Sequence, residues 1–261
     1  MRKNGMGRVR KSGAMRAGFA AAACGVLVVA LSACGGQGGG GASASGSGTK
    51  GTGGPGGQAG HSPPQTVDLT RIPDVGDRLQ QRIPPASHQV VAVYGEGKNS
   101  ADSTVVLYTK SGSTWDETRR WPAHNGTRGW TTDHHENDKR SPVGVFTLTD
   151  AGGVLDDPGA LLPYDQSETY QAPYDWDESH WHDFDYVIAI NYNRRVGAPP
   201  EDPHRPLGQS KGGEIWLHLD HDSGTSGCVT VSESAMEYLL RTLDPDQHPV
   251  VVMGDKADLN A

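Results

Sequence analysis

The sequence predicts one mainly β domain with a single helix. Three observations support this class: short runs rich in β-branched and aromatic residues recur between turn signals, one later run has the apolar spacing of a helix, and there is no internal repeat. We expect the domain over residues 88–256, a length that is ordinary for one hydrophobic core.

The first 33 residues have the layout of an export signal. Six basic residues and no acidic residue fall within positions 1–16, and residues 17–33 carry no charge. Small residues then precede Cys34, as in the lipobox of bacterial lipoproteins. We predict a signal peptide over 1–33, lipidation of Cys34, and an extracytoplasmic domain that faces the cell wall and is anchored in the cell membrane by its lipid. An uncleaved membrane anchor is the alternative, although 17 residues are at the short end for a span.

Residues 34–87 are predicted to form a flexible tether. Glycine, serine and proline dominate this segment, which offers too little apolar surface to offset the entropy lost on ordering. Without residues 1–33 the chain keeps 17 basic and 31 acidic residues, a net charge of −14. Nucleic acid is therefore excluded as a partner, because phosphate binding needs a concentrated basic face. An amine-bearing substrate fits this charge better.

Six runs in the predicted domain read as strands, and one reads as a helix. The strands are expected at residues 89–95, 103–110, 144–149, 186–192, 214–219 and 249–254. The helix is expected at 232–243, where a serine caps the start, four apolar residues form a stripe and Asp244-Pro245 ends it. Between strands, residues 151–185 form a long irregular region rich in Tyr, Trp and acidic residues. This region is either the wall of a binding cleft or an acidic surface loop.

Cys228 is the one cysteine that remains once Cys24 leaves with the signal peptide and Cys34 is acylated. An unpaired thiol in an exported domain is a candidate nucleophile, and a buried inert cysteine is the alternative. Only about 3% of an ordinary thiol is ionised at neutral pH, so a nucleophilic cysteine needs a nearby base.

His218 is the preferred base. If residues 214–219 and the segment "CVTV" at 228–231 pair as a hairpin about the turn "DSGTS", then His218 falls opposite Cys228, within contact distance. His221, in the turn, is the alternative base. Ser226 and Gly227 directly precede the cysteine, and the glycine allows the backbone N–H groups of Gly227 and Cys228 to form an oxyanion hole.

Histidine pairs also permit a different class of site. His218 with His221, His180 with His182, and His134 with His135 are candidate zinc ligands. None of these pairs has the H-E-x-x-H spacing of a helical zinc site. We therefore predict no metal and no cofactor.

Several motifs together resemble the L,D-transpeptidase catalytic domain of bacterial cell-wall enzymes. They are "SPVGVFTLTDAGG" at 141–153, "YVIAINYN" at 186–193 and "GGEIWLHLDHDSGTSGCVTVSESAMEYLLRTLDP" at 212–245, preceded by "HNGTRGWTTDHHENDKR" at 124–140. The Pro-x-Gly-x-Phe element at 142–146 and the His to Ser-Gly-Cys element at 218–228 are the most specific. Ser226 departs from the family, many of whose members have histidine there and a longer gap from the upstream histidine.

The resemblance implies an L,D-transpeptidase-like β-sandwich, with one helix after the cysteine, that acts on peptidoglycan stem peptides. Cys228 would attack the carbonyl of the third stem residue and expel the terminal D-alanine, with His218 taking the thiol proton. An amine on a neighbouring stem would then accept the acyl group, and carbapenem β-lactams would acylate the same thiol. Water as acceptor would make an L,D-carboxypeptidase, and a non-catalytic envelope-binding lipoprotein is the third alternative. No protein partner is predicted.

Overall fold

The computed structural model describes residues 69–261, and the predicted signal peptide, Cys34 and most of the tether lie outside the described residues. The elements, in chain order, are α1 (Asp77–Gln80), β1 (Gln89–Gly95), β2 (Asp102–Ser111), β3 (Thr114–His124), β4 (Trp130–Thr131), β5 (Ser141–Pro142), β6 (Gly144–Gly153), β7 (Tyr164–Gln166), η1 (Glu168–Tyr170), η2 (Glu178–His180), β8 (Val187–Ile190), η3 (Gln209–Lys211), β9 (Trp216–Leu219), β10 (Val229–Val231), α2 (Glu233–Thr242), η4 (Pro245–Gln247), β11 (Val250–Asp255) and α3 (Lys256–Leu259). No helix among them is long and apolar enough to span a membrane.

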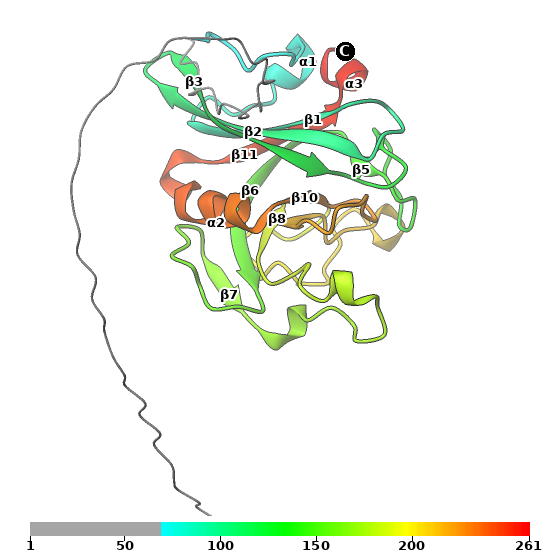
Figure 1. The fold of residues 1–261 in the computed structure, drawn as a ribbon. Helices are drawn as coiled ribbons and strands as arrows, with labels where there is room; N and C mark the ends of the chain where they lie inside the picture. The colour runs from blue at the N-terminus through cyan, green and yellow to red at the C-terminus, as the bar shows by residue number, and fades with distance from the viewer. Residues whose placement is uncertain (1–68) are drawn as a thin grey trace, which may run out of the picture. The chain divides into compact units, whose positions relative to one another are not determined.

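A single nine-stranded sheet dominates the domain and closes on itself (Figure 1). Its strand order is β11-β1-β2-β3-β10-β9-β8-β6-β7, and β11 also pairs with β6. The mainly β prediction is confirmed. The two layers of the expected sandwich are parts of one sheet, because β11 pairs parallel with β1 on one side and antiparallel with β6 on the other.

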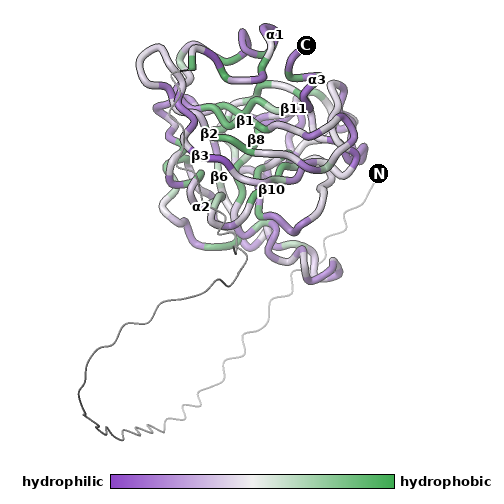
Figure 2. Tube along the Cα trace, turned by 45° about the horizontal axis from the view of Figure 1, so that its top comes forward, coloured by the Kyte–Doolittle hydropathy of each residue, from purple (hydrophilic) through white to green (hydrophobic). Residues whose placement is uncertain are grey.

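The strands β1, β2 and β11 are buried on both faces, and this explains their nearly continuous apolar sequences (Figure 2). In β1, Val91 and Val93 face the main core inside the closed sheet, whereas Val90 and Ala92 face a second core outside it. Residues 69–87, which include α1, and the helix α3 cover this outer face (Figure 1). Alternate residues of one strand thus stabilise two different clusters.

Residues 69–87 belong to the domain, so the predicted tether over 34–87 ends earlier than expected. Ile72, Val75, Leu79 and Ile83 are buried in the outer core, and Gly76 donates a backbone hydrogen bond to Leu259 of α3. Apolar residues spaced every three to four positions supply enough buried surface to order this segment, although prolines and charges interrupt it.

Leu79 provides a direct test of this boundary. Its side chain is fully buried, so Leu79→Ala is expected to lower the free energy of unfolding by about 2–5 kcal/mol, the usual cost of emptying a core site. Leu207→Ala is the matched control, because Leu207 is 65% exposed and its loss should change stability by less than about 0.5 kcal/mol. Denaturant unfolding measures both. Equal effects in the two variants would contradict the assignment of 69–87 to the domain.

The predicted helix after Cys228 is confirmed as α2, which ends just before Asp244-Pro245. Its apolar stripe packs into the main core. Ser232 is the N-cap residue but makes no side-chain capping bond, so the predicted serine cap does not form. Glu237 pairs with Arg241 one turn later. Burial of the stripe, rather than the cap, stabilises this helix.

Candidate active site

Cys228 lies at the end of a nine-residue loop, directly before β10. The half-buried thiol contacts backbone groups of the segment that leads into β9: the Trp216 N–H donates to Sγ at 3.4 Å, and the S–H donates to the Glu214 carbonyl at 3.4 Å. Burial of the sulfur raises the pKa of Cys228 to about 12. The resting thiol is therefore protonated at neutral pH, and any nucleophilic role requires a base.

His218 lies on β9 with its ring buried. Nδ1 is 2.9 Å from the Leu219 carbonyl oxygen, and because a carbonyl only accepts, Nδ1 carries the hydrogen. The lone pair of the imidazole is thus on Nε2. Burial lowers the pKa of His218 to about 4, so the ring is neutral at physiological pH and able to take a proton.

The strand pairing that was predicted to bring these two residues together is wrong. β9 and β10 are parallel neighbours, and His218 is paired with Thr230 rather than with Cys228. The loop between them does not form a tight turn, because Thr225 bonds across to residues 125–127 and carries the chain back to the start of β9. His218 and Cys228 nevertheless line the same cavity.

The Ser226-Gly227 step is held by two hydroxyl groups. Thr225 Oγ1 accepts from the Gly227 N–H at 3.0 Å and donates to the Cys228 carbonyl at 2.8 Å. Ser141 Oγ donates to the Gly227 carbonyl at 2.7 Å. The predicted use of the Gly227 N–H in an oxyanion hole is therefore wrong for this conformation, since Thr225 occupies that donor. The Cys228 N–H remains as the candidate donor.

Glycine is needed at position 227 for a packing reason. A Cβ there would approach the Arg140 carbonyl oxygen and the Ile215 side chain to 3.2 Å, closer than most real contacts. Ser226 is exposed and lines the cavities on both sides of Cys228.

The hydroxyl of Thr225 is expected to stabilise the conformation of the loop before Cys228. Thr225→Val keeps the shape of the side chain but leaves the buried Gly227 N–H without an acceptor, so we expect a loss of about 1–3 kcal/mol in unfolding free energy and slower modification of Cys228. Thr225→Ser retains the hydroxyl and should lose less than half as much. Thermal unfolding and thiol labelling rates measure the two effects, and equal losses in both variants would rule out the hydroxyl as the cause.

Two cavities open on either side of Cys228, with volumes of about 570 Å³ and about 520 Å³. The larger is acidic, since it contains Glu136, Glu201 and Glu214. The smaller contains His218 and His221. Residues of the irregular region 151–185, including Trp176 and Phe184, line both, so that region is a wall of the cleft rather than a remote surface loop.

Three residues of this site were missed in the sequence, namely Ser141, Thr225 and Asp183, and a fourth, His134, was considered only as a metal ligand. His134 is buried in the larger cavity, 3.4 Å from the position that a Cβ of Gly227 would take. Ser141 and Thr225 hold the loop, and Asp183 lies in the smaller cavity. Ser141 and His134 fall within the quoted family motifs, which was the available signal. No sequence signal marked Asp183 apart from its place in an acidic loop.

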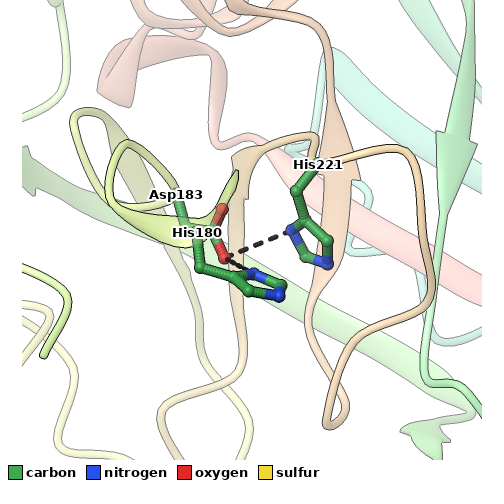
Figure 3. Close-up of side chains that lie close together, drawn as sticks. All are labelled: His180, Asp183 and His221. Atoms are coloured by element: carbon green, nitrogen blue, oxygen red, sulfur yellow. Dashed lines mark hydrogen bonds and ion pairs between the residues drawn. The ribbon is translucent and has the colours of Figure 1, made fainter. Parts of the chain in front are cut away.

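The histidines that were paired by sequence as possible metal ligands have other partners in the structure. His180 and His221 meet at Asp183 (Figure 3). His182 pairs with Asp185, the buried His134 faces Asp138, and the exposed His135 faces Asp133. Asp220, near the predicted base, bonds to Thr230 Oγ1 at 2.6 Å and to His124 Nδ1 at 2.8 Å. Its position supports the packing of β10 against β3.

The fold and site thus define a mainly β domain in which a free cysteine and a buried, neutral histidine line one cavity. A family model described as the L,D-transpeptidase catalytic domain, YkuD, matches residues 94–252. The chain belongs to this family, and the resemblance seen in its motifs is confirmed.

The structure of Bdellovibrio bacteriovorus Bd1075 is similar at 15% sequence identity, with a TM-score of 0.37, over 73% of this chain and 53% of that chain. The chain therefore spans about half the length of that relative. None of the curated proteins matches the chain.

Proposed function

We propose that the protein is a peptidoglycan L,D-transpeptidase in which Cys228 is the nucleophile and His218 the base. The observation that carries the proposal is the state of the two side chains in one cavity: a thiol with a pKa raised to about 12 and a neutral imidazole whose Nδ1–H is fixed by Leu219. Because the thiol does not ionise by itself at neutral pH, it needs a base, and the unprotonated Nε2 of His218 can take its proton.

The reaction begins with a rotation of the thiol. Its hydrogen points to the Glu214 carbonyl at rest and has to turn towards His218 before attack on the stem carbonyl. His218 then takes the proton, the Trp216 N–H stabilises the developing thiolate charge, and the Cys228 N–H stabilises the oxyanion. Protonated His218 returns the proton to the leaving D-alanine amine, which leaves an acyl-thioester on Cys228.

An amine acceptor is favoured by the charge of the larger cavity. Glu136, Glu201 and Glu214 line it, and a carboxylate-rich cleft attracts an ammonium group. The amine attacks the thioester after His218 removes its proton, and the product is a cross-link between two stems. The same intermediate attacked by water gives a shortened stem, the product of an L,D-carboxypeptidase.

Purified muropeptides separate these outcomes. A cross-linked dimer that forms from tetrapeptide stems together with released D-alanine supports transfer. Shortened stems without dimers would assign the hydrolytic activity, and unchanged stems would favour the non-catalytic binding protein.

We also propose that the chain is a lipoprotein anchored at the outer face of the cell membrane, as residues 1–34 predict. Cys34→Ala is expected to give an unprocessed chain without the lipid mass, because the processed N-terminus and the acyl chains both require that thiol. Membrane fractionation and intact mass of the protein from its own cells measure this. A processed, membrane-bound Cys34→Ala chain would contradict lipidation at this position.

A further inference from the structure

Three side chains converge on one point in the wall of the smaller cavity (Figure 3). Asp183 Oδ2 is 3.0 Å from His180 Nδ1 and 3.2 Å from His221 Nδ1. The three ligand atoms all lie within 4.8 Å of one another. The residues come from the end of η2, the turn after it and the loop after β9, so the fold brings together positions that are far apart in the sequence.

Backbone contacts hold this cluster in place. The Asp183 carbonyl accepts from the Leu219 N–H at 3.0 Å, which ties the irregular region to the end of β9, and the Asp183 N–H donates to the His180 carbonyl at 3.2 Å. His180 ends a 3-10 turn that Asp177 caps. His180 and Asp183 are therefore preorganised by hydrogen bonds that do not involve their own side chains.

His221 Nδ1 is a buried polar atom without a hydrogen bond among the described residues. The side chains of His221 and Asp183 are each only 5% exposed. The carboxylate oxygen is within ion-pair distance of Nδ1, yet the geometry is not that of a hydrogen bond. Buried polar groups normally have a well-aligned partner, whereas this atom faces Asp183 Oδ2 at 3.2 Å without hydrogen-bond geometry.

Two imidazole nitrogens and one carboxylate oxygen are ligand atoms that zinc commonly binds in proteins. Zinc binds histidine nitrogen and carboxylate oxygen at about 2.0–2.2 Å in a tetrahedron, and this places ligand atoms about 3.3–3.5 Å apart. The separations of 3.0 Å and 3.2 Å around Asp183 Oδ2 are close to that spacing. Two histidines and one carboxylate also leave a fourth position open.

We propose that His180, Asp183 and His221 form a divalent metal site, with zinc as the ion, in the cavity that also contains Cys228. All three ligands line this cavity, so the open fourth position is reached from it and takes water or a carboxylate. The His221 ring is stacked on that of His218, with centroids 6.2 Å apart and planes at 17°. Bound zinc therefore adds positive charge beside the candidate base without using it as a ligand.

Without metal, the same three residues form a histidine-aspartate-histidine contact. Burial raises the pKa of Asp183, but its contacts with His221 and His180 outweigh this and lower it, and contact with the Asp183 carboxylate raises the pKa of His221.

The test is direct zinc binding to the full chain, and it is independent of any enzymatic activity. The chain is purified with a chelator, dialysed, and titrated with Zn²⁺ by calorimetry, in a Cys228→Ala background that removes the thiol as a ligand. Tetrahedral Co²⁺ absorption provides a second readout. We expect one ion per chain and at least about 100-fold weaker binding in His221→Ala and Asp183→Asn, since even outer-shell changes cost 10- to 100-fold.

His182→Ala is the matched control. His182 contacts Asp185 at 2.9 Å with the same spacing in sequence, but its side chain is 81% exposed and residues 69–261 place no third ligand there. This variant should bind zinc like its parent. Absence of a bound ion, or equal loss in His182→Ala and His221→Ala, would overturn the proposal. Circular dichroism of each variant separates loss of a ligand from loss of the fold, and Asp183→Asn serves where His221→Ala does not fold.

Discussion

A chain with Cys228→Ala is expected to show no covalent carbapenem adduct and no acyl transfer to or from stem peptides. Cys228 is the free cysteine of the described residues, and its sulfur is the nucleophile in the proposed reaction. The hydroxyl of Thr225 is not available to replace it, because Thr225 Oγ1 is engaged with the backbone on both sides. Intact mass followed by peptide mapping of the unchanged chain should place one adduct on the peptide that contains residue 228.

Cys34→Ala is the control for the first experiment, because it removes the cysteine that is predicted to be lipidated rather than the candidate nucleophile. This variant should be labelled like the unchanged chain. An adduct that persists in Cys228→Ala, or a chain that is never labelled, would contradict a nucleophilic role for Cys228. The second result would favour a binding protein that uses the acidic cavity and not the thiol.

His218→Ala is expected to slow carbapenem acylation at neutral pH by about 10²- to 10⁴-fold, the usual contribution of a positioned general base. With a pKa of about 12, only about one Cys228 thiol in 10⁵ is ionised at pH 7 without a base. His221→Ala should retain most of the rate, because His221 Nδ1 is engaged with the Asp183 carboxylate at 3.2 Å.

The pH profile distinguishes a base from a merely structural histidine. In the unchanged chain the pKa of His218 is about 4 and that of Cys228 about 12, so the neutral pair is constant between these values and the acylation rate should be flat from about pH 6 to about pH 9. In His218→Ala the rate should rise about tenfold per pH unit as the thiolate fraction increases. A flat profile in the variant, or a larger loss in His221→Ala, would reassign the base.

Local sequence patterns predicted most of the sheet because its central strands are buried on both faces. β1 and β11 are unbroken apolar runs, and both were placed within one residue of their observed bounds. β3 was missed, since Arg119, Arg120 and Pro122 interrupt its alternation and much of it remains accessible. The outer core was missed for a related reason: residues 69–87 contribute single apolar side chains between prolines and charges.

The residues of the candidate site could be selected from the sequence, whereas their geometry could not be predicted. Cys228 and His218 could be selected from residue type and motif, and they do line one cavity. The direction of β10 relative to β9 could not be predicted, because it depends on bonds from Thr225 to residues 125–127, about a hundred positions earlier. For the same reason no local pattern joins His180 and Asp183 to His221. Contacts between distant segments decide these features, and spacing along the chain does not report them.

The pairing of β11 has a consequence for how the chain folds. Val90 of β1 pairs with Val250 of β11, and β11 also pairs with β6. The sheet therefore closes only when the first and last strands of the chain meet. Such long-range pairing makes folding slow and strongly cooperative. Before β11 pairs, β1 and β6 each have an unpaired edge and the sheet is not closed. Such an incompletely folded chain is suited to the passage across a membrane that its N-terminus predicts.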